Sequence, residues 1–325
     1  MRNLRSRRYE IRVILPLLMI VYSTCTLCGL ASAQSGEQAL RARIIALEAE
    51  NQALRKLLME IQTTVANTPP ATPPAGESSR RFRIVVEPGD WGSSSLADTT
   101  KVCESTASAF IPYLSSNDYA PLLVSNDASG PITLYRRGAN NEHLVRLNTG
   151  NRAWAQLAFQ FSHELCHILC NYRKVENPQL WFEETLCECA SLFALRQMAK
   201  TWKTDPPYSN WKSYSSALND YAAQRLKALQ SDKQSAEEIY VANRSKLESS
   251  GTDRDLNNRL AAKLLPLFEK DPTAWEAVQY LNRGPAEENA DFQSYLTGWY
   301  ERVPEQKKVF VVRVGKLFGL SIRAE

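Results

Sequence analysis

The chain has 325 residues, 44% of them hydrophobic and 23% charged, a composition typical of a globular protein with a buried core. Its formal net charge of +4 arises largely from arginines among the first twelve residues, and the remaining charge is nearly balanced. This composition favours no nucleic-acid partner, and we expect none.

The N-terminal segment has the three parts of a secretory signal. Basic residues precede an uncharged stretch from residue 13 to 33, which ends in the small residues Ala31-Ser32-Ala33. The same stretch is long enough to span a bilayer if it stays uncleaved. We therefore expect residues 1–33 to be a signal peptide or signal anchor. The rest of the chain is expected to be periplasmic or extracellular, either soluble or membrane-anchored by residues 13–33.

Residues 37–66 carry a heptad pattern. Leucine or isoleucine recurs every seven residues on one seam, and Asn51 is the lone polar residue on the other. Such a residue is typical of a parallel pair with a fixed register. We predict a coiled coil that joins copies of the chain into a homo-oligomer, with a single amphipathic helix as the alternative. Residues 67–80 contain four prolines and are predicted to be a linker.

Residues 81–200 are predicted to form an α+β unit, and residues 201–325 a mostly helical C-terminal subdomain. Helical patterns dominate the sequence after Asn151. Short runs of β-branched residues and strict alternation indicate strands before that point. The elements predicted there are strands at 81–88 and 121–127, a helix at 99–114 and a strand hairpin at 131–149. His143, in the second arm of the hairpin, is interpreted as a surface residue.

The segment 154–171 is predicted to be a helix with a buried apolar stripe. At about 100° per residue, His163 and His167 project together from the side opposite that stripe. Two imidazoles one helical turn apart can both reach one metal ion, and Glu164 beside them can take a proton from metal-bound water. The pattern therefore predicts a zinc site on this helix.

A third ligand is expected in the segment 181–195. Its start, Trp-Phe-Glu-Glu at 181–184, resembles the second active-site helix of the gluzincin metallopeptidases, the thermolysin-like and aminopeptidase-type zinc enzymes. The resemblance implies a zincin-like catalytic core with a small mixed sheet, an edge hairpin, a histidine helix and a glutamate helix. It also implies one Zn²⁺ ion held by His163, His167 and Glu184.

Position in the motif selects Glu184 rather than Glu183 as the ligand. Glu184 and Glu188 are one turn apart on one face, while Glu183 points about 100° away. In the resembled group, an acidic residue one turn after the ligand often holds a zinc-binding imidazole. We expect Glu188 in that role, which orients the ring and raises its basicity. A solvated helix face is the alternative interpretation of this glutamate cluster.

The cysteines add a second expectation about these helices. An oxidising compartment permits disulfides, and we expect one that links the two helices. Its partners would come from the four cysteines of these segments, and the connectivity stays open. A thiolate ligand in a His/His/Cys site, with Cys170 as the nearest thiol, is the alternative. The four residues are Cys166, Cys170, Cys187 and Cys189.

These features predict an exported zinc-dependent metallopeptidase that hydrolyses bonds in a peptide or protein substrate. Glu164 would act as general base, and a tyrosine would stabilise the oxyanion, with Tyr208, Tyr214 and Tyr221 as unranked candidates. The hairpin arm nearer the histidine helix is expected to pair with the substrate backbone. One alternative is a catalytically silent, exported coiled-coil interaction protein with a metallopeptidase-like binding domain. Another is a structural zinc module with cysteine ligands.

Overall fold

The structure is a computed structural model that divides into two compact units, Met1–Glu77 and Ser78–Glu325. The predicted signal segment 1–33 and the predicted linker 67–80 lie outside the described residues. Within the ranges that are described, no helix is both long enough and apolar enough to cross a membrane. The described residues are 38–53, 55–56, 82–115, 119–175, 177–227, 229, 232–284 and 290–322.

In the first unit, residues 38–53 are helical, as are residues 55–56. The apolar side chains Leu40, Ile44 and Leu47 are exposed there. All three belong to the predicted heptad seams, where a second copy of the chain would cover them. Pairing of copies stays a prediction, and the end of the predicted coiled coil lies outside the described residues.

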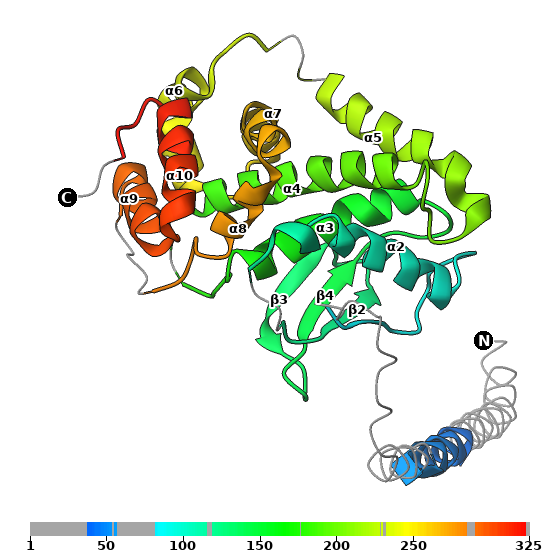
Figure 1. The fold of residues 1–325 in the computed structure, drawn as a ribbon. Helices are drawn as coiled ribbons and strands as arrows, with labels where there is room; N and C mark the ends of the chain where they lie inside the picture. Colours follow the sequence, from blue (N-terminus) through cyan, green and yellow to red (C-terminus); the bar gives the residue numbers. More distant parts are fainter. Residues whose placement is uncertain are drawn as a thin grey trace, which may run out of the picture. The chain divides into compact units, whose positions relative to one another are not determined.

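The second unit is α+β and contains a mixed four-stranded sheet with the order β1-β2-β4-β3 (Figure 1). β1, β2 and β4 run parallel, and β3 pairs antiparallel with β4. The predicted hairpin is confirmed as β3 and β4, but the arm nearer the histidine helix is the interior strand, and β3 is the edge. The strands are β1 (Ile84–Val86), β2 (Leu122–Asn126), β3 (Ile132–Arg137) and β4 (His143–Leu147).

The interior position of β4 changes the interpretation of His143. Alternate residues of a strand face opposite sides of the sheet, and His143, Val145 and Leu147 are all buried. His143 is only 6% exposed, so its interpretation as a surface residue is wrong. Helix α3 (Trp154–Leu169) packs on β4, and the ring of Tyr172 lies 6.1 Å from that of His143, so neighbours outside the sheet cover this side chain.

The helices cover the sheet and build the rest of the unit. α2 and α3 pack on the sheet, α4 packs on α3, and α5 and α7 pack on α4 (Figure 1). Short 3-10 helices lie at Ile111–Tyr113, Ser209–Tyr214 and Pro272–Ala274. The α-helices are α2 (Leu96–Ser108), α3 (Trp154–Leu169), α4 (Leu180–Thr201), α5 (Ser215–Lys227), α6 (Ala236–Ser249), α7 (Arg254–Lys270), α8 (Trp275–Val278), α9 (Phe292–Arg302) and α10 (Glu305–Leu317).

α4 is the central element of the unit. Buried residues occur all around this helix, which is typical of a helix with neighbours on every side. Its first turn is fixed by aromatic packing: the rings of Trp181 and Phe182 lie 4.6 and 5.1 Å from that of Phe292 on α9, and Phe318 completes the cluster. The C-terminal helices therefore hold the start of α4, where the glutamates of the candidate site begin.

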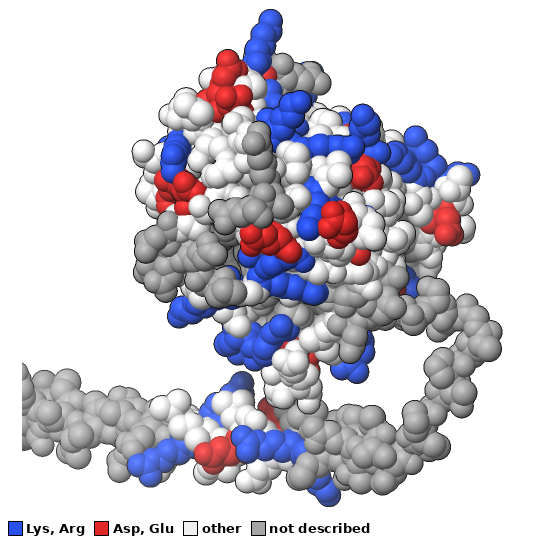
Figure 2. All heavy atoms as spheres, turned by 60° about the vertical axis from the view of Figure 1, so that its left-hand side comes forward, with Lys and Arg blue, Asp and Glu red and all other residues white. Residues whose placement is uncertain are grey.

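Basic and acidic side chains are interspersed on the face of the molecule shown in Figure 2.

Candidate metal centre

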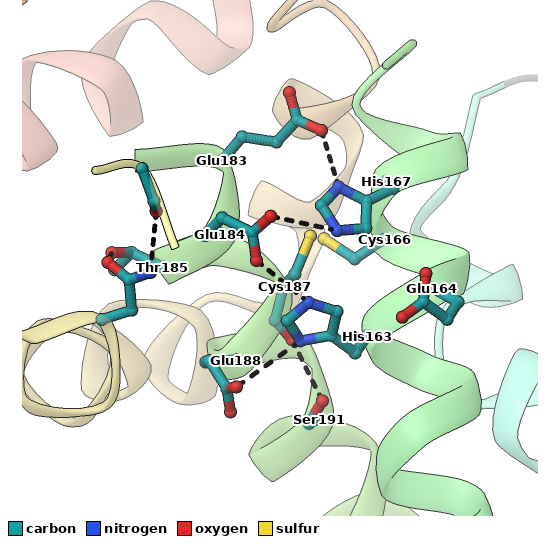
Figure 3. A network of polar contacts seen from close by, with 12 residues as sticks. His163, Glu164, Cys166, His167, Glu183, Glu184, Thr185, Cys187, Glu188 and Ser191 are labelled. Carbon is teal, nitrogen blue, oxygen red and sulfur yellow. Dashed lines mark hydrogen bonds and ion pairs between the residues drawn. The ribbon is translucent and has the colours of Figure 1, made fainter. Parts of the chain in front are cut away.

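The two histidines lie side by side on α3. Trp154, Phe161 and Leu165 are among the apolar residues that this helix buries, as its periodicity predicted. His163 and His167 stand one turn apart with ring centroids 5.1 Å apart, and their side chains are 15% and 14% exposed. Burial of the opposite stripe thus turns both imidazoles toward α4 (Figure 3).

The carboxylate of Glu184 faces both rings. One of its oxygens lies 3.2 Å from Nε2 of His163, and the other lies 3.7 Å from Nε2 of His167. Figure 3 shows the carboxylate reaching from α4 to the two imidazoles on α3. The structure therefore brings together the three side chains that were predicted as metal ligands.

The outer nitrogens of the two rings also face carboxylates. Nδ1 of His163 lies 3.7 Å from Glu188, which occupies the predicted position but is beyond hydrogen-bond length. Nδ1 of His167 lies 2.7 Å from Oε1 of Glu183, a short hydrogen bond. Glu183 does point away from Glu184, as the helix period predicts, but that direction leads to the second histidine, a contact that the sequence did not indicate.

Glu183 is itself held by a residue far along the chain. Asn282 donates its side-chain amide to Oε2 of Glu183 at 2.7 Å, and Tyr295 donates its hydroxyl to the amide oxygen of Asn282 at 2.8 Å. The backbone N–H of Asn282 donates to the carbonyl of Cys170 at the end of α3. The chain from Tyr295 to His167 thus fixes the imidazole orientation, and no local sequence pattern marks it.

The charges of this cluster shift the pKa values of its members. Burial lowers the pKa of His167, but the hydrogen bond and charge of Glu183 outweigh it and raise the value to about 10. Burial likewise opposes protonation of His163, whose pKa is raised by Glu184 and Glu188. Burial raises the pKa of Glu184, and the bond to His163 and the imidazolium charges lower it overall. In the metal-free chain these contacts favour the cationic form of both histidines and the anionic form of Glu184.

Glu164 lies on the same helix between the two histidines and is only 3% exposed. Thr133 on the edge strand donates its hydroxyl to Oε2 of Glu164 at 2.9 Å. This hydrogen bond links Glu164, the predicted general base, to β3. It involves only one of the two carboxylate oxygens of Glu164. The sequence did not indicate this contact of Glu164 with Thr133.

A cavity of about 410 Å³ opens onto these groups. Glu164 and Glu184 line it together with three residues of β3, among them Tyr135. Of the three tyrosines named from the sequence, Tyr221 lines the cavity, and its hydroxyl accepts a hydrogen bond from Arg225 at 3.2 Å. The other two pack elsewhere: Tyr208 against Trp211, and Tyr214 against Trp154.

Two distances at the site, one to each carboxylate oxygen of Glu184, can be compared with those around a zinc ion. Nitrogen and oxygen ligands lie about 2.1 Å from zinc, so two ligands of a tetrahedral ion are about 3.4 Å apart. The distances from Glu184 to the two histidine nitrogens, 3.2 and 3.7 Å, lie on either side of that value. Two imidazoles and one carboxylate are also donors that zinc accepts in catalytic sites.

The thiol of Cys187 is a second candidate for the third ligand. Its sulfur and one nitrogen from each histidine all lie within 4.8 Å of one another. Cys187 is fully buried, whereas the Glu184 side chain is 17% exposed and lines the cavity. Because a catalytic ion keeps a position open to solvent, Glu184 suits a catalytic site and Cys187 a closed one. Cys170, the thiol favoured from the sequence, is not part of this group.

The described cysteines are all free and buried. The sulfurs of Cys166 and Cys170 are 4.0 Å apart, about twice the length of a disulfide bond. The structure therefore does not contain the disulfide predicted among Cys166, Cys170, Cys187 and Cys189. Burial raises the pKa of Cys187 and of Cys189 well above the ordinary thiol value, which keeps these side chains protonated as small core residues.

Comparison of the chain with protein-family models, with curated proteins and with solved structures finds no match.

Proposed function

We propose that this protein is an exported zinc-dependent metallopeptidase with a zincin-like catalytic core. The observation that carries the proposal is the position of the Glu184 carboxylate, which lies within 3.2 and 3.7 Å of Nε2 of His163 and His167. These side chains come from two helices and converge beside a cavity that also contains a buried carboxylate. The arrangement supports a hydrolytic site more than a purely structural one.

His163, His167 and Glu184 would hold the ion, with Glu183 orienting the second imidazole. When bound there, zinc supplies Lewis-acid polarisation of the scissile carbonyl and acidifies water. Glu164 acts as the general base that takes the proton of the attacking water and delivers it to the leaving amine. The hydrogen bond from Thr133 restricts the rotation of Glu164, so that the base is already oriented when substrate arrives.

The cavity wall suits an extended peptide. β3 is an edge strand, and its residues Ile132, Thr133 and Tyr135 line the cavity. Such an edge can accept a substrate backbone as an additional strand, which provides affinity with little demand on sequence. Tyr221 and Arg225 lie on the part of the cavity wall that α5 forms. Both side chains carry hydrogen-bond donors, so they are the candidates for oxyanion stabilisation.

The proposal is tested by separating metal binding from hydrolysis in the full chain. Glu164→Gln should bind one zinc ion as the wild type does, and should lose cleavage of a mixed peptide library followed by mass spectrometry. His163→Ala should lose both properties. Glu301→Gln is the matched control, because Glu301 is an exposed carboxylate on α9 away from the cavity lining. Full activity of Glu164→Gln would contradict the mechanism.

The same experiment addresses the catalytically silent interaction protein. That alternative predicts zinc in the wild type, capture of peptides and no cleavage of any of them. A non-catalytic interaction protein would have no function for Glu164, although this carboxylate lines the cavity and accepts a hydrogen bond from Thr133. A structural zinc module predicts that zinc depends on Cys187 rather than Glu184. Self-association through residues 37–66 remains part of the proposal and is measured by sedimentation.

A further inference from the structure

A second cavity of about 370 Å³ lies at the C-terminal end of α3. It is lined by residues from β3, β4, the segment after α3 and the segment around residues 279–283. Its volume falls in the range of pockets that hold small molecules. Tyr172 lines both this cavity and the one at the candidate metal centre, with its ring 6.1 Å from that of His143 and 6.5 Å from that of His167.

The lining of this second cavity is cationic. Arg137 on β3 and Arg283 after α8 both contribute to it, and none of its described lining residues is acidic. Neither guanidinium forms an ion pair with the described part of the chain; that of Arg283 rests on the ring of Tyr280 at 4.5 Å. The carboxylate of Glu142, the residue before His143, accepts hydrogen bonds from the backbone and side-chain amides of Asn140 in the hairpin turn. Among the described residues, no carboxylate therefore neutralises either guanidinium group, and both can contact a ligand.

The remaining polar wall is already ordered. Asn171 donates to the carbonyl of Gln279 at 2.6 Å, and the side-chain oxygen of Gln279 accepts from Ser115 at 2.9 and 3.0 Å. His143 differs from these, because its Nδ1 is buried and has no hydrogen-bond partner in the described part of the chain. This ordered part of the wall lies in the same cavity as the two exposed arginines, and a wall that is already ordered lowers the cost of binding a ligand.

We propose that this second cavity binds a small organic anion, whose phosphate or carboxylate group is held between Arg137 and Arg283 with His143 as a further polar contact. Guanidinium groups bind both kinds of oxyanion through paired hydrogen bonds. The cavity volume leaves room for a carbon skeleton beside the ring of Tyr172. This proposal does not depend on peptide hydrolysis at the metal centre.

Isothermal titration of the full chain with three probes of similar size tests it: phenyl phosphate, benzoate and benzamide. One or both anions should bind, and neutral benzamide should bind at least tenfold more weakly. The relative affinity of the two anions identifies the preferred oxyanion. Arg137→Gln and Arg283→Gln should each weaken anion binding about tenfold or more, as expected for the loss of a charge-assisted contact. Arg136→Gln, next to the cavity residue on the same strand and exposed, should change nothing.

Because anions can also bind at a metal centre, Arg254→Gln provides the matched control for the first cavity, which Arg254 lines. It should leave anion binding unchanged. Loss of binding in Arg254→Gln but not in Arg137→Gln would place the anion in the first cavity and overturn the proposal. Equal binding of benzamide, or undiminished binding by the double variant of Arg137 and Arg283, would overturn it as well. Thermal unfolding of each variant verifies the fold.

Discussion

Replacing Glu183 by glutamine tests how the histidine pair is held. The side chain is 5% exposed and accepts hydrogen bonds from both His167 and Asn282 at 2.7 Å. Glutamine has nearly the same shape but carries one donor group in place of an acceptor oxygen. The amide oxygen of Asn282 already accepts a hydrogen bond from Tyr295, so Asn282 presents its NH2 group to residue 183. The NH2 group of a glutamine at position 183 would therefore face either this NH2 group or the ring N–H of His167. One of these contacts is therefore lost, together with the charge.

The magnitude follows from two independent rules. A hydrogen bond to a charged group contributes about 1.5–3 kcal/mol. Loss of an outer partner of a metal-binding histidine typically weakens metal affinity about 10–100-fold, which corresponds to about 1.4–2.8 kcal/mol. Glu188→Gln is the matched comparison, because Glu188 lies 3.7 Å from the other imidazole and its second oxygen has no partner in the described residues. We expect it to change zinc affinity less than about threefold.

The assay is competition for zinc against a chromophoric chelator at one pH and ionic strength, with urea unfolding of the metal-free variants as the control for folding. Glu183→Gln should weaken zinc binding about 10–100-fold and Glu188→Gln hardly at all. A Glu183→Gln variant within threefold of the wild type would refute the role of the Asn282–Glu183–His167 chain. So would a loss in Glu188→Gln as large as that in Glu183→Gln.

Three further outcomes follow from the same contacts. In the chelator assay, Glu184→Ala should weaken zinc binding more than the loss of a hydrogen-bond partner of a metal-binding histidine does, which is about 10–100-fold. Cys187→Ser should have little effect. A large loss in Cys187→Ser with little loss in Glu184→Ala would identify the thiol as the ligand. Trp299→Phe should destabilise the fold by roughly 1–3 kcal/mol more than Trp275→Phe in urea unfolding. The reason is that only the indole N–H of Trp299 has a hydrogen-bond partner in the described residues, at 2.8 Å. Burial, assisted by the charge of a neighbouring arginine, lowers the pKa of His143 from 6.5 to about 4, so the unfolded chain binds more protons between these values. The free energy of unfolding therefore rises with pH through this range, and the contribution of His143 is complete above about pH 6.5 and lost toward pH 4. This contribution amounts to about 3 kcal/mol at 1.36 kcal/mol per pKa unit, or about 2 kcal/mol after screening by solvent. His143→Gln should remove this part of the pH dependence of unfolding, and an unchanged difference between pH 4.5 and pH 7.5 would contradict the assignment.

Local periodicity predicted the parts of the site that lie on one helix. His163 and His167 are four residues apart, and the apolar residues between and around them face the core, so a helix has to present both rings on its other side. The hairpin and the helical C-terminal part were predictable for the same reason, because strand and helix periods differ. Glu184 came from its resemblance to a motif, and the structure brings its carboxylate to the histidines.

Contacts between elements were decided by the tertiary structure. A helix period fixes the angle between Glu183 and Glu184, but only the crossing of α3 and α4 determines that both carboxylates reach histidines. In the same way, parallel pairing of β2 with β4 leaves β3 at the edge, where Thr133 meets Glu164. Asn282 reaches Glu183 from a position 99 residues further along the chain. Side-chain direction within one element follows from local backbone geometry, whereas the partner that a side chain meets depends on packing of the whole chain, which no short segment encodes.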